Sequence, residues 1–186
     1  MRVVEVISVL LFFVLAIVNS FSLAVPIWFL PVAALAGWLL ADLLSGLAHW
    51  AGDTFGSVHT PVLGRALIRP FGEHHADPRG MTRHGFIEVN GASCLGCLPI
   101  LTVLIFFPFN PFIHSILVFF CLGILLANQC HKWAHMNEPP ALVRALQKLG
   151  LILRADEHRL HHKPPHNRHF CTASGWLNRP LNYILK

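Results

Sequence analysis

Charged residues are scarce in this sequence. Only 12% of its 186 residues are Asp, Glu, Lys or Arg, whereas 54% are hydrophobic. This shortage excludes an ordinary soluble domain, in which about 25% of the residues are charged. The length gives room for a single domain, 1–186. Together with the mean hydropathy of +0.56, the composition predicts an integral membrane protein.

The cysteines do not indicate a disulfide framework. The chain has five cysteines, an odd number. Cys94 and Cys97 form a CxxC, but no second CxxC and no βαβ pattern accompanies it. We therefore expect these thiols to be small buried side chains that pack a helix.

Several functional motifs are missing. The sequence has no HExxH, HxxEH or GxSxG, so the usual zinc hydrolases and α/β-hydrolases are excluded. It has no internal repeat, low-complexity tract or flexible linker. The sequence pI of about 9.3 fits a membrane topology next to anionic headgroups, so nucleic acid is not needed to explain the positive charge.

Four apolar runs are present instead. A helix that crosses the hydrocarbon needs about 20 apolar residues, so the shorter runs must recruit flanking residues. The predicted transmembrane helices cover about 3–19, 25–48, 93–109 and 112–130. The alternative for the first run is a cleaved signal peptide, although the second run follows almost at once.

The basic residues predict the orientation of these helices. Apart from Arg2, every Lys and Arg lies in 65–83 or 132–186. Because such residues stay on the cytoplasmic side, we expect both termini and the central loop in the cytoplasm. The predicted fold is all-α and membrane-embedded, with four transmembrane helices in two hairpins and a cytoplasmic histidine-rich cap.

A shorter helix is predicted over about 139–154. Leu142, Leu146 and Leu149 recur at helical spacing, with Arg144 and Lys148 between them. The segment is too short and too charged to span. We interpret it as an amphipathic helix in the headgroup layer; the alternative is a helix packed on a soluble core.

Thirteen histidines are the main functional signal. None precedes residue 49, and most fall in four clusters. Residues four apart share a helix face, as His131 and His135 do, and as His49 and Asp53 do. Several imidazoles on one face would repel if charged and need partners if buried, which favours metal binding. Outside the clusters, we expect His59, His114 and His169 to be ordinary polar residues.

Ten converging ligands would suffice for two metals with open positions. The predicted ligands are His49, Asp53, His74, His75, His84, His131, His135, His158, His161 and His162. No catalytic residue is expected beyond them. Imidazole suits zinc, copper, iron and nickel alike, but the missing hydrolase motifs favour two histidine-bound irons that activate O2.

Neighbouring polar groups could orient the ligand imidazoles through their second nitrogen. The predicted supporting residues are Glu73, Asp77, Glu88, Asn128 and His166. The carboxylates could instead cap helices or pair with arginines such as Arg79, Arg83 or Arg159.

Several ordered blocks resemble the Kua or lipid-desaturase-domain family. They are DLLSGLAHWAGDTFG (42–56), EHHADP (73–78), TRH (82–84), FIEVNG (86–91), NQCHKWAH (128–135), HRLHH (158–162) and FCTASGWLN (170–178). The stretch 73–91 looks closest to the plasmanylethanolamine desaturase branch, which forms the vinyl ether of plasmalogens. Other members are plastid desaturases of phosphatidylglycerol, a less fitting comparison because no transit peptide precedes the first apolar run.

The resemblance implies a diiron desaturase. It would use two iron ions, O2 and electrons from a carrier such as cytochrome b5 or ferredoxin, and its substrate would be the alkyl chain of an ether glycerophospholipid. The membrane would be the bacterial inner membrane or the endoplasmic reticulum. The alternatives are an acyl-lipid desaturase or hydroxylase with the same site and, in another class, a membrane metal transporter or sensor.

Overall fold

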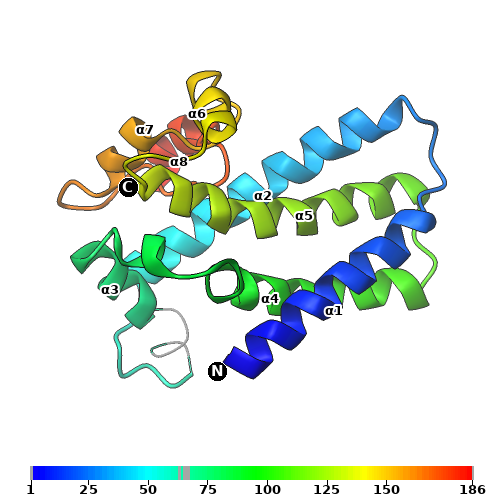
Figure 1. Ribbon diagram of the computed structural model, residues 1–186, viewed down its shortest axis with the longest axis horizontal. Helices are drawn as coiled ribbons and strands as arrows, with labels where there is room; N and C mark the ends of the chain where they lie inside the picture. The colour runs from blue at the N-terminus through cyan, green and yellow to red at the C-terminus, as the bar shows by residue number, and fades with distance from the viewer. Residues whose placement is uncertain (1, 63, 65–67, 186) are drawn as a thin grey trace. The chain divides into compact units, whose positions relative to one another are not determined.

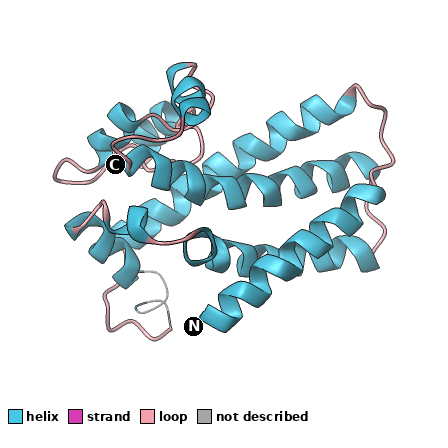
Figure 2. Ribbon diagram, viewed as in Figure 1, coloured by secondary structure: helices cyan, strands magenta, loops and turns pink. Residues whose placement is uncertain are grey.

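The computed structural model describes residues 2–62, 64 and 68–185, and within these ranges it contains helices and no strand (Figure 2). Four helices are long and apolar enough to cross a membrane, over Val3–Phe21, Phe29–Thr54, Phe86–Phe106 and Pro111–His135. The predicted all-α fold with four membrane helices is therefore confirmed. Arg65, the first residue of the basic stretch 65–83, lies outside the described residues.

The helices follow one another in the order shown in Figure 1. Their bounds are α1 (Arg2–Phe21), α2 (Phe29–Thr54), α3 (Arg69–Ala76), the 3₁₀ helix η2 (Gly80–Arg83), α4 (Phe86–Phe106), α5 (Pro111–His135), α6 (Ala141–Lys148), α7 (Ala155–His161) and α8 (Asn178–Ile184). The chain forms two compact units. Unit 1 comprises Met1–Ala41 and Gly85–Gln129, and unit 2 comprises Asp42–His84 and Cys130–Lys186.

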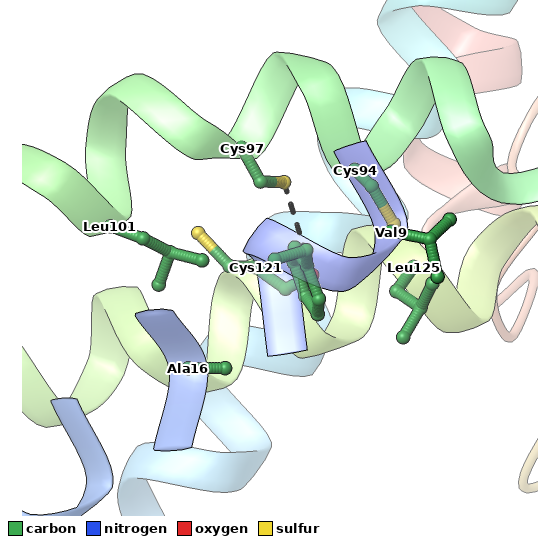
Figure 3. Close-up of a cluster of buried hydrophobic side chains, with 8 residues drawn as sticks. Val9, Ala16, Cys94, Cys97, Leu101, Cys121 and Leu125 are labelled. Carbon is green, nitrogen blue, oxygen red and sulfur yellow. Dashed lines mark hydrogen bonds between the residues drawn. The ribbon is translucent and has the colours of Figure 1, made fainter. Parts of the chain in front are cut away.

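Unit 1 is built on apolar packing of α1 and α4 with α5. Its core contains Phe12 and Leu101, both fully buried, and the thiols of Cys94, Cys97 and Cys121 (Figure 3). All five cysteines of the chain are free and buried. The thiols thus pack helices, as the sequence predicted, because their small apolar side chains fill space between larger ones.

Close helix approach in unit 1 depends on small residues. A Cβ atom at Gly37 of α2 would lie 2.6 Å from the backbone nitrogen of Phe120 in α5. Only glycine permits this separation. Small residues at such contacts are typical of helix pairs in membranes, where packing rather than the hydrophobic effect holds the helices together.

Unit 2 contains the ends of α2 and α5, together with α3, η2 and α6–α8. Phe170, Cys171 and Leu181 form its small core, against which Trp50 of α2 packs. The helix predicted over about 139–154 runs from Ala141 to Lys148, and Gly150 follows with a φ of +68°. This left-handed conformation stops the helix. Every residue of the clusters described below belongs to unit 2.

Candidate metal centre

Nine of the ten predicted ligands lie in two groups. Within each group, one potential ligand atom per residue lies within 4.8 Å of all the others. The five-histidine group comprises His74, His131, His135, His158 and His162. The aspartate group comprises His49, Asp53, His75 and His161. These are the groups of three or more such residues among the positions that the structure describes.

Four helices supply eight of these side chains, the ninth, His162, directly follows α7, and local sequence spacing explains the arrangement. His49 and Asp53 are one turn apart near the end of α2, and His131 and His135 are one turn apart at the end of α5, so each pair shares a face. Adjacent residues point in different directions on a helix. Accordingly, His74 and His75 of α3 belong to different groups, and so do His161 and His162.

The imidazoles of the five-histidine group face one another through their Nε2 atoms. His158 Nε2 lies 2.9 Å from that of His135 and 3.2 Å from that of His162. His162 Nε2 lies 3.1 Å from His74 Nε2. An imidazole nitrogen carries either one proton or one lone pair, so hydrogen bonds can satisfy at most two of these three contacts.

A metal ion satisfies all of them. Two nitrogens at right angles around one metal, each about 2.1 Å from it, lie about 3.0 Å apart. The spacing of the Nε2 atoms matches this value. His131 contributes a further Nε2 that is buried and has no hydrogen-bond partner. The residues therefore fit a metal with several nitrogen ligands.

Asp53 lies at the centre of the aspartate group. Its Oδ1 is 3.0 Å from His75 Nε2, and its Oδ2 is 3.4 Å from His161 Nε2 and 3.6 Å from His49 Nε2. The Nε2 atoms of His49 and His161 are buried without a hydrogen-bond partner, as is Asp53 Oδ2. Buried polar atoms are nearly always satisfied. A cation bound among these atoms would satisfy them together.

Backbone carbonyls orient two of these ligands. His49 Nδ1 donates to the carbonyl of Phe170 at 3.0 Å, and His161 Nδ1 donates to that of Arg168 at 2.9 Å. Because a carbonyl only accepts, each Nδ1 must carry the proton and each Nε2 must present its lone pair. Such outer hydrogen bonds fix the tautomer of metal-binding histidines.

Burial keeps the imidazoles outside the membrane-spanning segments neutral. It lowers the pKa of His74 and of His161 to about 3 and that of His162 to about 4, with positive charge on neighbouring histidines adding to the effect for His74 and His162. The pKa of His158 is lowered for the same reasons. Neutral imidazoles at pH 7 are the form that binds metals.

Sequence reasoning missed Asp42 as part of this centre. Its buried carboxylate accepts backbone N–H groups from Ala173, Ser174 and Gly175 at 2.8–3.2 Å through Oδ1, and from Leu177 at 3.2 Å through Oδ2. Asp42 and His49 are seven residues apart, so one face of α2 holds the segment that carries the Phe170 carbonyl. The seven-residue spacing was the only signal of this role in the sequence, because Ala173, a hydrogen-bond partner of Asp42, is 131 residues away.

His84 lies in neither group. It follows η2, and its carbonyl accepts a hydrogen bond from Lys132, the neighbour of the ligand candidate His131. Its assignment as a ligand stays a prediction. His166 is closer to the groups, because its Nδ1 donates to the His161 carbonyl at 3.1 Å and its ring centre is 4.4 Å from that of His75.

The other supporting candidates have clear partners of their own. Glu73 pairs with Arg69 at 2.7 Å, and Asp77 pairs with Arg83. Glu88 accepts the backbone N–H of Gly85 at the start of α4. Asn128 of unit 1 donates to the Val89 carbonyl and the Ser93 hydroxyl. Their predicted roles beside the metal ligands stay predictions.

The apolar helices and the paired histidine groups define a helical membrane protein with a candidate two-metal centre. The chain belongs to the lipid desaturase domain family, whose model matches residues 38–185. The match covers all nine grouped residues. The family resemblance seen in the sequence is thus confirmed.

Curated relatives are similar over most of this chain. The plasmanylethanolamine desaturase of Myxococcus xanthus is 47% identical over 84% of the chain and 57% of its own length. The mouse plasmanylethanolamine desaturase 1 is 44% identical over 82% of the chain and 60% of its own length. The Arabidopsis thaliana chloroplastic fatty acid desaturase 4-like 1 is 36% identical over 84% of the chain and 54% of its own length. The chain therefore spans somewhat more than half of each relative, and no solved structure matches it.

Proposed function

We propose that this protein is an O2-dependent lipid desaturase that forms the vinyl ether of a plasmalogen from an alkyl ether glycerophospholipid. The observation that carries the proposal is the pair of ligand groups. Nine side chains, eight from four helices and His162 from the end of α7, converge, and several of them have buried nitrogen or oxygen atoms without a hydrogen-bond partner. Structural ion pairs would not leave so many ligand atoms without partners.

The proposed ligands are the five-histidine group for one iron and the aspartate group for the other. Histidine nitrogens with one carboxylate are a donor set that suits iron. Two irons, when bound, supply the reduction of O2 and the removal of two hydrogens from the alkyl chain. His84 stays a predicted tenth ligand, which a His84→Ala variant would test by its iron content.

The protein's own residues position the reaction and keep water away. His49, His158 and His161 are at most 1% exposed, so the reacting carbons would meet a dry surface. The carbonyls of Phe170 and Arg168 fix two of the imidazoles before substrate binds. Such preorganisation lowers the cost of reaching the productive geometry.

The substrate assignment rests on the relatives. Two proteins named plasmanylethanolamine desaturase share 47% and 44% identity with this chain. The Arabidopsis chloroplastic fatty acid desaturase 4-like 1, at 36%, favours acyl-lipid desaturation as the second candidate. Electrons would come from a carrier such as cytochrome b5 or ferredoxin.

The topology that we propose is the one predicted from the positions of the basic residues. Residues 1–186 would form one membrane-embedded desaturase domain with both termini and unit 2 in the cytoplasm, in the bacterial inner membrane or the endoplasmic reticulum. The electron carrier would then reach the metal centre from the cytoplasm.

The contacts of Asp42 do not favour the alternative function, a membrane metal transporter. This is the one carboxylate well inside an apolar run, and a transporter would need such a group to bind ions in transit. Both of its oxygens already accept backbone N–H groups. Asp42 therefore holds the fold together.

Purified protein tests the proposal directly. Supplied with iron, O2 and a reductant or a cell extract, it should convert 1-O-alkyl glycerophosphoethanolamine into an acid-labile product two hydrogens lighter. An acyl desaturase would give an acid-stable product of the same mass change, and a hydroxylase would add an oxygen. An unchanged ether lipid under both reducing conditions would refute the proposal.

A further inference from the structure

A cationic hollow lies in unit 2, outside the two ligand groups. Its volume is about 450 Å³, and Arg144, Lys148, Arg154 and Arg159 line it with one carboxylate, Asp156. The pocket's positive side chains come from α6, α7 and the segment that joins them. The hollow is large enough for a phosphate group and part of its substituents.

The single carboxylate does not neutralise this charge. Asp156 is already engaged with Arg154 through two hydrogen bonds, at 3.0 Å and 2.5 Å. Arg144, Lys148 and Arg159 thus have no further carboxylate among the lining residues. The guanidinium of Arg144 is held in place by a 2.8 Å hydrogen bond to the Pro139 carbonyl. Guanidinium groups gathered in this way are suited to phosphate.

Some residues that line the hollow are sequence neighbours of the five-histidine group. Met136 and Asn137, which line the hollow, directly follow His135. Arg159 directly follows His158 on α7. Two stretches of the chain, the one after α5 and α7 itself, therefore place residues that line the hollow next to ligand candidates in sequence.

The surroundings of the hollow fit the headgroup layer of a membrane. Leu142 and Leu149 expose 71% and 72% of their surface, one on α6 and one just after it. Exposed leucines beside cationic side chains are typical of helices that lie at the membrane interface. Lipid phosphate is the most abundant anion at that depth.

We propose that the cationic hollow binds the phosphate of the glycerophospholipid substrate. This inference rests on the proposed function, because that reaction requires a site for the phosphate of its lipid substrate. The first two carbons of the ether chain are separated from the phosphate only by the glycerol backbone. A desaturase that acts on those carbons must bind the phosphate close to its metals, and residues that line the hollow directly follow the ligand candidates His135 and His158 in the chain.

Lipid binding without turnover tests the assignment. Native mass spectrometry of the purified protein would compare alkylacyl-glycerophosphoethanolamine with the same alkylacylglycerol lacking phosphate. The wild type should prefer the phospholipid by about tenfold, the value of one lost charged hydrogen bond or more. Arg144→Gln and Arg159→Gln should each remove most of this preference. Arg179→Gln, an exposed arginine of α8 outside the hollow, should keep it.

Iron content serves as the check on folding, since each variant should bind as much iron as the wild type. An undiminished lipid preference in both hollow variants would overturn the proposal. Inorganic phosphate that occupied the hollow as effectively as the phospholipid would also overturn the proposal, because the hollow would then be a site for free anions. The proposal would also be wrong if the two hollow variants lost binding to an acidic electron carrier but kept the lipid preference. Phosphate-dependent binding without desaturation would instead refute the proposed function and leave the hollow's role standing.

Discussion

At the scale of single residues, His161 and His162 show how finely the centre is divided. They are adjacent in sequence, yet His161 lies in the aspartate group and His162 in the five-histidine group. Their ring planes are turned by 81° to each other. One helical turn therefore supplies ligands to both proposed irons.

Because the two histidines lie in different groups, we expect their substitutions to remove iron from different sites. His161→Gln should lower the iron bound to the aspartate group, and His162→Gln the iron bound to the five-histidine group, because each loses one donor. Each variant should retain about half of the wild-type iron, and the double variant almost none. Iron per protein would be measured by plasma mass spectrometry.

His59→Gln provides the matched control, because His59 is exposed and outside both groups. It should retain the wild-type iron content. If His161→Gln and His162→Gln also retained it, the two-group assignment would be wrong.

Asp42 is the second residue with a defined prediction. In Asp42→Asn the amide would oppose the Leu177 N–H that Oδ2 now accepts, and the charge that attracts the other three N–H groups would be lost. We expect a destabilisation of about 2–3 kcal/mol, measured by thermal unfolding in detergent. Iron in the aspartate group should also fall, because the Phe170 carbonyl would no longer hold His49 firmly.

Ser45→Ala is the control for Asp42→Asn. It removes two hydrogen bonds but no charge: Ser45 Oγ accepts from the Thr172 N–H at 3.1 Å and donates to the Asp42 carbonyl at 2.8 Å. The cost should be about 1–2 kcal/mol, with the iron content unchanged. An Asp42→Asn protein that unfolded at the wild-type temperature with full iron content would contradict the role given to this carboxylate.

At the scale of helices, α4 offers a matched pair of glycines. A Cβ at Gly91 would lie 2.6 Å from Cβ and 3.0 Å from Cα of Glu5 in α1, whereas a Cβ at Gly96 would meet nothing within 4 Å. Gly91→Ala must push α1 away from α4. Figure 1 shows these two helices side by side.

We expect Gly91→Ala to destabilise the protein by about 1–3 kcal/mol. Gly96→Ala should be neutral or stabilising by up to about 1 kcal/mol, because alanine favours the helix. Thermal unfolding of both variants in the same detergent checks this. Equal unfolding temperatures for the two would show that α1 and α4 do not approach as closely at Gly91 as described.

Helix-level patterns were the easiest to predict from the sequence. The apolar runs predicted the four membrane helices, and the i, i+4 spacing of His49 with Asp53 and of His131 with His135 predicted shared faces. These are local properties of a helix. The assignment of neighbours to different groups was not predictable, because it depends on how four separate helices converge.

Tertiary contacts also decided the roles of the carboxylates. The i, i+4 spacing with His49 marked Asp53 as a ligand candidate, whereas the local sequence left two roles open for Asp77, which pairs with Arg83. The role of Asp42 was not predictable, since its backbone partners lie in a segment distant in sequence. The cationic hollow escaped prediction because it depends on how α6, α7 and the segment between them fold together.

At the scale of the whole molecule, the chain matches 57% of one plasmanylethanolamine desaturase relative and 60% of another, and the range matched by the family model includes both groups. The family model begins at residue 38, shortly before Asp42 and the histidines of α2. The chemistry we propose therefore depends on residues within this chain.

Lipid analysis of cells tests that central claim most directly. In a host that contains alkyl ether phospholipids but forms no vinyl ethers, expression of the wild type should produce acid-labile lipids two hydrogens lighter than the alkyl ether species. His131→Ala, which removes a buried proposed ligand of the five-histidine group, should produce none at the same protein level. Unchanged ether lipids with the wild type, or equal vinyl ether with the variant, would contradict the account.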